Sequence, residues 1–342
     1  MSSRDFSPAG RGLPAALAAH ARNRPEEPWL FYAEGLDWRW RSWRQLAGWV
    51  ARWAAPLAAL PAGTRVGFAG AASPPALALD LAIQSCGLIA VPLARSPAPS
   101  APPAVEAWQR ALAARRCDVW AERVAGMGTP GAGAGRSAAG VGPCPRLVDL
   151  PPEDGSSRQV GTVMASGGSA LHAPLAGGVV VDSSAGPSER SQAELVAAAA
   201  SIQDLVAAAT GGADDTDDKT SREIVVAALP LADPAGRALL AWATVAGAAV
   251  VLEPDAARLV PTAAWARPTL FHGSAAELAA LRRIVESQPG RRRGWAGVRP
   301  RLPFGRLRTA LVVEGEGGGA MADSDLAFWE SRGVRVAAAP VV

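Results

Sequence analysis

The chain has 342 residues, of which 49% are hydrophobic and 19% are charged, so it can bury a sizeable core and lacks the composition of a disordered protein. Its formal net charge of +3 is too small to indicate nucleic-acid binding by itself, and we expect no nucleic-acid partner. The 34 Lys and Arg residues include a single lysine, Lys219, so any mechanism that requires a lysine has one candidate.

Cysteine, histidine and hydropathy patterns predict a cytoplasmic protein without a membrane span. An odd number of cysteines without a CxxC pair is typical of a reducing compartment, and the histidines are too widely spaced for a metal site. These residues are Cys86, Cys117, Cys144, His20, His172 and His272. The N-terminus lacks the apolar core of a secretory signal. The most apolar stretch, residues 238–252, is shorter than the roughly 20 residues of a membrane helix, so we predict a buried helix and strand there.

Helices and strands alternate along the first part of the chain. The predicted elements are a helix at residues 12–22, strands at 29–33 and 36–40, a helix behind Ser42, a strand at 65–69, a helix from 74 to about 86, and strands at 88–91, 117–121 and 146–150. Glu34 and Gly35 are typical of a hairpin turn. Ser42 and Gln45 form a capping box for the helix that follows. The apolar residues of this helix recur at helical spacing and predict one buried face: Leu46, Trp49, Val50, Trp53, Ala54 and Leu57.

Four of the twelve tryptophans crowd around this hairpin and helix, namely Trp38, Trp40, Trp43 and Trp49. One interpretation is an aromatic platform for a ligand, and the other is a core packed with large rings. We prefer the core, because aromatic side chains bury large apolar areas wherever they occur.

The second part of the chain continues the alternation. The predicted elements are a strand at residues 178–181, a helix at about 191–209, a strand at 223–228, a helix ending at 246, strands at 248–252 and 268–271, a helix behind Ser274, a strand at 309–313, a helix at 321–332 and a strand at 334–338. Ser274 and Glu277 form a second capping box. Strands that alternate with helices imply βαβ units, so the sequence predicts an α/β fold with a largely parallel sheet.

Three segments of unusual composition have a functional and an ordinary interpretation. GAGAG at residues 131–135 lies in a Gly/Ala-rich stretch, residues 123–144, without the strand and helix that a phosphate loop requires, so we prefer a surface insertion. The four aspartates of residues 211–220 do not fit the spacing of a calcium loop and indicate a solvated connection. The arginines at 291–293 are candidate phosphate contacts, although a solvated basic loop is the preferred interpretation.

The order of elements resembles the N-terminal part of the AMP-binding, adenylate-forming superfamily, which includes acyl-CoA synthetases, adenylation domains and luciferases. Five stretches in register carry this resemblance: LPAALAAHARNRPEEPWLFY, WRWRSWRQLAGWVARWAAPL, GTRVGFAG with LAIQSCGLIAVPL, VVAALPLADPAGRALLAWATVAGAAVVLEP, and RLRTALVVEGEGGGA. The resemblance implies a layered αβαβα-type domain with largely parallel sheets and flanking helices. We expect residues 1–342 to form an incomplete large domain, with subregions 1–150 and 160–342 joined by the insertion at 123–144, and without the small C-terminal lid domain.

The resemblance also implies an ancestral ATP-dependent activation of a carboxylate to acyl-AMP. The family holds phosphates with a Ser/Thr/Gly-rich loop ending in Pro-Lys-Gly, whose N–H groups and lysine neutralise charge at the reacting phosphate. ASGGSALHAPLAGG, residues 165–178, occupies that position. The candidate cofactor-binding residues are Ser166, Gly167, Gly168, Ser169, Gly177 and Gly178 of this degenerate loop, together with Asp233, Gly317 and Gly318. A second stretch, SSAGPSERS at residues 183–191, could align with the same phosphate-loop motif. We call these two alignments the first and the second register, and the choice between them stays open.

Departures from the family pattern affect the groups that the chemistry needs. Neither register contains a lysine, His172 is mostly neutral near pH 7, and Lys219 lies in an acidic loop. The sequence also lacks the Tyr-Gly-x-Thr-Glu motif, the ribose-binding aspartate and the lid with its catalytic lysine. We therefore predict no catalytic residue in this chain, and binding of ATP or AMP with Mg²⁺ that is weak or lost.

Three hypotheses follow for the function. The chain is a divergent acid-activating ligase that takes a carboxylic acid or acyl ligand and is completed by a separate chain supplying the lid. Alternatively, it is a non-catalytic pseudoenzyme that acts as a binding or interaction module, or a truncated gene product. A sheet that stops early would expose unpaired strand edges, so we also predict self-association.

Overall fold

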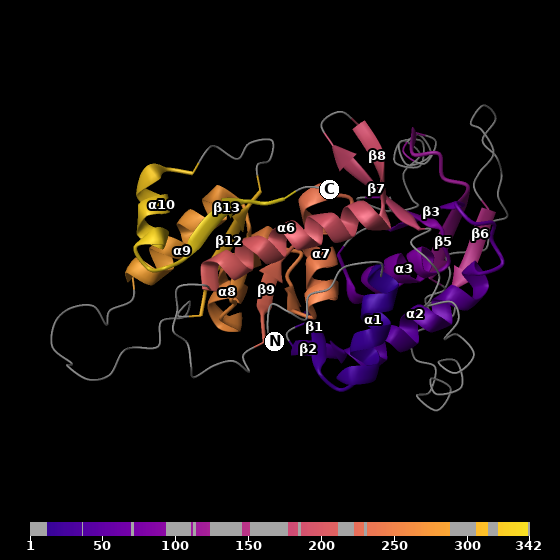
Figure 1. The fold of residues 1–342 in the computed structure, drawn as a ribbon, viewed down its shortest axis with the longest axis horizontal. Coiled ribbons are helices and arrows are strands. Elements are labelled where there is room, and N and C mark those ends of the chain that lie inside the picture. Colours follow the sequence, from indigo (N-terminus) through magenta and orange to yellow (C-terminus); the bar gives the residue numbers. More distant parts are fainter. Residues whose placement is uncertain are drawn as a thin grey trace.

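The structure is a computed structural model that describes residues 12–35, 37–69, 72–93, 111, 114–123, 146–150, 177–183, 186–210, 222–228, 231–287, 306–313 and 321–340. Helices and strands alternate in these segments as the sequence predicts. They build two sheets with helices between and outside them (Figure 1).

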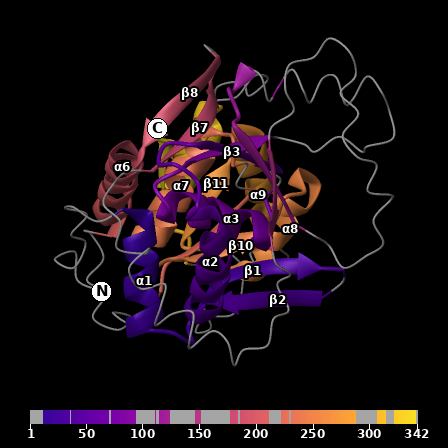
Figure 2. The same cartoon turned by 90° about the vertical axis from the view of Figure 1, so that its right-hand side faces the viewer.

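The chain begins with a helix, a hairpin and a second helix. These are α1 (Leu13–Asn23), β1 (Pro28–Glu34), β2 (Asp37–Ser42) and α2 (Trp43–Leu57). The predicted capping box is present, because Ser42 Oγ accepts from the Gln45 N–H at 3.3 Å and Gln45 Oε1 accepts from the Ser42 N–H at 3.0 Å. Figure 2 shows β1 and β2 side by side at one edge of their sheet.

A six-stranded sheet is built mainly from the middle of the chain. Its elements are β3 (Arg65–Ala69), α3 (Pro74–Ser85), β4 (Ile89–Leu93), β5 (Val119–Arg123), β6 (Arg146–Leu150), β7 (Gly178–Ser183) and β8 (Gly186–Ser191). The strand order is β6-β5-β3-β4-β7-β8, and all neighbours are parallel except the β7–β8 hairpin. The prediction of largely parallel sheets is therefore confirmed.

A seven-stranded sheet contains most of the C-terminal strands. Its further elements are α6 (Gln192–Thr210), β9 (Ile224–Ala227), α7 (Pro234–Ala246), β10 (Ala249–Leu252), α8 (Ala256–Ala266), β11 (Leu270–Gly273), α9 (Ala275–Ser287), β12 (Thr309–Val312), α10 (Asp323–Glu330) and β13 (Arg335–Ala338). The order is β13-β12-β11-β9-β10-β1-β2, with β1–β2 as its antiparallel pair. Both sheets take strands from both sequence subregions, since β1 and β2 join the later strands while β7 and β8 join the earlier ones.

The main hydrophobic core joins the two sheets. It contains side chains from both sheets and from α1, α2, α3, α6 and α7. α3 is buried at every position from Ala76 to Ser85, and α7 from Ala235 to Thr244, as expected for helices that lie between two layers. Figure 1 shows α6 running across this middle layer. The apolar stretch 238–252 thus forms a buried helix and strand as predicted, and no helix in the described segments is long and apolar enough to cross a membrane.

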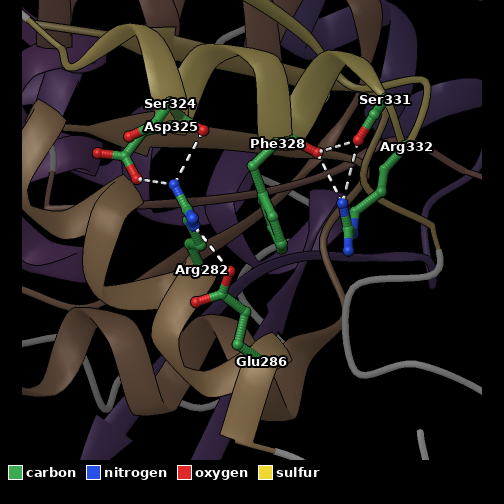
Figure 3. A network of polar contacts seen from close by, with 7 residues as sticks. All are labelled: Arg282, Glu286, Ser324, Asp325, Phe328, Ser331 and Arg332. Carbon is green, nitrogen blue, oxygen red and sulfur yellow. Dashed lines mark hydrogen bonds and ion pairs between the residues drawn. The ribbon is translucent and has the colours of Figure 1, made fainter.

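A second core lies on the outer face of the seven-stranded sheet, under α8, α9 and α10. Its rim is closed by Phe328, whose ring lies between two guanidinium groups: the Cζ atoms of Arg332 and Arg282 are 3.5 Å and 4.9 Å from the ring centroid (Figure 3). Arg282 also contacts Glu286 and Asp325, at 2.9 Å each. Because these charges are partly exposed, the apolar contact of the ring contributes more than the ion pairs.

The structure differs from the sequence prediction at two elements. α8 forms although it contains Pro261, and Asp255 caps its N-terminus by accepting from the Ala257 N–H. β8 forms where we expected a loop, since its residues pair with β7.

The core interpretation of the tryptophans is confirmed for Trp43, which is fully buried, whereas Trp40 is 46% exposed.

Candidate functional site

The described segments contain only part of the site predicted from the sequence. Gly177, Gly178 and Asp233 lie inside them. The remaining candidates lie outside the described residues: Ser166, Gly167, Gly168, Ser169, Gly317 and Gly318, as do His172, Lys219, the GAGAG segment, the aspartate-rich loop and the arginines at 291–293.

Gly177 and Gly178 lie at the amino end of β7, where they pack closely against backbone. A Cβ on Gly177 would lie 2.7 Å from the carbonyl oxygen of Gln84 and 3.2 Å from that of Leu88. A Cβ on Gly178 would lie 2.8 Å from the carbonyl oxygen of Arg190. Close packing against backbone therefore explains why both positions are glycine, and their role in phosphate binding stays a prediction.

This packing leads to a testable expectation for Gly177→Ala. The methyl group would meet three backbone atoms that cannot rotate away, so we expect a loss of about 1–3 kcal/mol in the free energy of unfolding. Denaturant unfolding with and without ATP measures this effect. An equal loss under both conditions agrees with a packing role, whereas unchanged stability together with weaker ATP binding would contradict it.

The second register, residues 183–191, occupies the β7–β8 hairpin. β8 begins at Gly186, beside the carboxyl end of β7, and Gly186 has φ +108, a conformation that residues other than glycine rarely adopt. The Ser188 Oγ atom is buried and has no hydrogen-bond partner among the described residues. The second register therefore begins at the carboxyl end of the parallel strand β7.

The turn after β9 lies next to the same end of the hairpin. The Asp182 N–H donates to the Ala232 carbonyl oxygen at 2.8 Å. β9 is also the strand at which the chain changes direction in its sheet, because β10 pairs on one side of it and β11 on the other. Ligands of open α/β sheets bind outside the carboxyl ends of strands at such a switch point. The geometry therefore brings the carboxyl end of β7 and residues 231–233 together as a candidate site.

Asp233 is the N-cap of α7, where its side chain accepts from the Gly236 N–H. Burial raises the pKa of this carboxyl above its usual value, and the backbone bonds from Gly236 and Ala235 oppose that shift. The carboxylate thus satisfies the first turn of a helix whose positive dipole end lies in the candidate site.

Gly178 and Asp233 are not neighbours. β7 rises by about 3.3 Å per residue, so Gly178 lies roughly 13 Å from Asp182, which marks the end near the turn. Gly177 and Gly178, the described residues of the first register, therefore lie at the amino end of β7. The second register begins at the carboxyl end, which is shared with Asp233, and returns along β8 until Ser191 pairs with Gly178.

Ion pairs fasten the hairpin to the outer face of the six-stranded sheet. Arg115 donates to both carboxylate oxygens of Asp182, at 2.8 and 2.7 Å, in a bidentate pair. Arg65 Nη1 lies 2.6 Å from Glu189 Oε2, and its Nε donates to the Arg115 carbonyl oxygen at 3.0 Å. These contacts fix the hairpin, but they also engage both arginines with protein carboxylates, so neither guanidinium is free to neutralise a phosphate.

Sequence reasoning missed a buried polar cluster between the two sheets. Asp80 on α3 and Arg237 on α7 are 0% and 2% exposed, and Arg237 Nη1 lies 2.6 Å from Asp80 Oδ2. Gln84 and Gln192 continue the cluster. The available signal was the presence of polar residues four apart, Asp80 and Gln84, in an otherwise apolar helix.

Histidine and cysteine residues supply no metal site in the described part of the chain, where no group of three or more His, Cys, Asp or Glu side chains is close enough to hold an ion. His272 on β11 is 5% exposed, and its Nε2 atom has no partner among the described residues. Burial lowers its pKa from 6.5 to about 4, so this imidazole is neutral at pH 7.

Comparisons with known proteins show the fold. No protein-family model matches the chain, and no curated protein matches it either. Among solved structures, the inhibitor-bound N-terminal domain of FACL13 from Mycobacterium tuberculosis matches with a TM-score of 0.59 at 14% identity, over 95% of this chain and 74% of that chain.

Two ligand-bound structures match over a smaller part of their own length. The AMPPNP-bound nonribosomal peptide synthetase FmoA3 has a TM-score of 0.63 at 16% identity, over 96% of this chain and 31% of that one. The o-succinylbenzoate CoA synthetase MenE from Bacillus subtilis, in complex with the acyl-adenylate intermediate OSB-AMP, has a TM-score of 0.58 at 15% identity, over 94% and 57%. The chain thus has the fold of the N-terminal part of adenylate-forming enzymes, as the resemblance predicted.

Proposed function

We propose that this chain is a divergent protein of the AMP-binding, adenylate-forming type that binds ATP or AMP weakly and does not complete carboxylate activation by itself. The observation that carries the proposal is the match of about 95% of the chain to structures that include an AMPPNP complex and an acyl-adenylate complex. Mg²⁺ would accompany the nucleotide as its counter-ion, and the second ligand would be a carboxylic acid or its acyl group.

Local geometry supports a nucleotide site between the β7–β8 hairpin and the turn after β9. Gly186 of β8 lies at the carboxyl end of β7, and the N-terminus of α7 follows the turn. Helix N-termini favour anions because their N–H groups and dipole are positive, but the Asp233 carboxylate already accepts from the Gly236 N–H, which reduces this contribution at α7. The described residues of the site include no lysine, and Arg115 and Arg65 beside the hairpin are paired with Asp182 and Glu189, so the charge of a triphosphate would be poorly neutralised.

Two assays test binding and catalysis separately. ATP and AMP should raise the unfolding temperature, because a ligand that binds only the folded state stabilises it. Carboxylate-dependent exchange of labelled pyrophosphate into ATP should be absent for the chain alone across a broad panel of acids. Exchange by the chain alone would refute the loss of catalysis. Exchange that appears only after addition of a separate lid domain would support completion by a partner.

The two registers can be distinguished by adding the lysine that each lacks. Ser188→Lys places a lysine after Pro187 in the hairpin, and Leu175→Lys places one after Pro174 in the earlier segment. A fixed cation beside the phosphates should raise ATP affinity about fivefold to tenfold relative to AMP. We expect this gain for Ser188→Lys alone, measured by isothermal titration. Each variant is the control for the other, and a gain in Leu175→Lys alone would move the site to residues 165–178.

A further inference from the structure

The buried polar cluster forms a continuous line across the middle layer of the protein. The Leu13 N–H donates to Gln192 Oε1 at 2.9 Å, Gln192 Nε2 donates to Gln84 Oε1 at 2.9 Å, and Gln84 Nε2 donates to Asp80 Oδ2 at 2.7 Å. Arg237 completes the line, because its Nη1 atom lies 2.6 Å from Asp80 Oδ2, the same oxygen that accepts from Gln84. The cluster therefore ties α1, α6 and α3 to α7, the crossover helix of the other sheet.

Arg237 makes a second contact that points toward the candidate site. Its Nε donates to the carbonyl oxygen of Leu231, in the turn that follows β9. The next carbonyl, that of Ala232, accepts from the Asp182 N–H of the hairpin. The Arg237 guanidinium and the backbone of the hairpin therefore contact consecutive carbonyl groups of the same turn.

A net gain in stability does not explain this ion pair well. Removing two charges from water is costly, and a buried pair is often no more stabilising than apolar side chains of similar volume. A planar guanidinium, however, fixes several acceptors in one geometry, which a flexible apolar side chain cannot do. The ion pair therefore contributes orientation rather than stability, because it sets where the turn after β9 lies relative to α3.

We propose that Asp80 and Arg237 are positioning residues, which hold residues 231–233 against the β7–β8 hairpin and thereby shape the nucleotide site. This inference rests on the proposed function for its effect on ATP, but its effect on the turn does not depend on ATP. Neither side chain touches the ligand. Asp80 on α3, a helix of the six-stranded sheet, holds Arg237, and Arg237 in turn holds the turn that follows β9 of the seven-stranded sheet.

The double variant Asp80→Leu with Arg237→Met separates positioning from stability. Apolar side chains replace both charges, so no unpaired charge is left, and the loss of stability should be smaller than for either single change, although Gln84 Nε2 loses its acceptor on Asp80. The Leu231 carbonyl nevertheless loses its donor. We expect hydrogen exchange at the Asp182 and Gly236 amides to accelerate about tenfold, and the dissociation constant for ATP to rise about tenfold.

Arg237→Lys provides a second variant in case the double variant does not fold. A lysine keeps the charge beside Asp80, but its single ammonium cannot also replace the Nε donor to Leu231. Faster exchange at the same two amides, with exchange in α9 unchanged, supports positioning. Wild-type exchange at these amides in a folded variant would overturn it.

The two proposals fail in different ways. If wild-type protein shows no binding of ATP or AMP, the proposed function is wrong, while the exchange rates still decide whether the pair positions the turn. If wild-type protein binds ATP and the folded double variant binds it equally well, the positioning role for the nucleotide site is refuted.

Discussion

Replacing Arg237 alone by methionine is expected to lower the free energy of unfolding by about 3–5 kcal/mol. The variant leaves the Asp80 carboxylate, which is 0% exposed, without its cation. It also leaves the Leu231 carbonyl without the Arg237 donor. An uncompensated buried charge costs far more than the intact pair contributes, so the single change should be much more harmful than the double change to apolar residues.

Denaturant unfolding at constant pH measures this loss, and the chain offers a matched control. Arg44→Met removes an arginine that is 56% exposed and lies 2.8 Å from Glu26, which is itself 70% exposed. Partly exposed pairs contribute about 1 kcal/mol or less, so this control should remain close to the wild type. Similar small losses in both variants would mean that water reaches Asp80, and would contradict its burial.

Periodicity and capping were sufficient to predict most of the fold. The spacing of Leu46, Val50 and Trp53 defines the buried face of α2, and Ser42 with Gln45 defines its start. Such signals are local: they depend on residues within one or two turns of each other, so they can be read without tertiary structure. The same holds for Ser274 and Glu277, whose reciprocal contacts begin α9.

The site was harder to predict because its determinants are distant in the sequence. Asp80 and Arg237 meet only when two crossover helices pack between the sheets, and nothing in either local segment identifies the partner. The strand character of β8 was also hidden, since GPSERS has low strand propensity and forms a strand only by pairing with β7. That pairing places the start of the second register at the carboxyl end of β7, the end that contacts the turn before Asp233, a relation that sequence order did not reveal.

Acidification should destabilise the protein between pH 6.5 and pH 4 through its two described histidines. Burial lowers the pKa of His272 to about 4, and burial together with the charge of Arg24 lowers that of His20 to about 4. In the unfolded chain both titrate near 6.5, so below that pH the unfolded state binds protons that the folded state refuses. Above pH 6.5 both states are neutral and this contribution to stability is complete.

The expected loss for each histidine is about 1.4 kcal/mol per pH unit below 6.5, or roughly 2 kcal/mol by pH 5. Denaturant unfolding at pH 7, 6 and 5 measures it in a range above the titration of most carboxylates. His272→Gln removes one titrating group, so its stability should fall with pH about half as steeply as that of the wild type. The absolute stability of the variant at pH 7 is not the readout, since only the difference in slope reports the histidine. Parallel curves for the two proteins would mean that the imidazole of His272 gains a proton as easily when folded as when unfolded, and that water therefore reaches the end of β11.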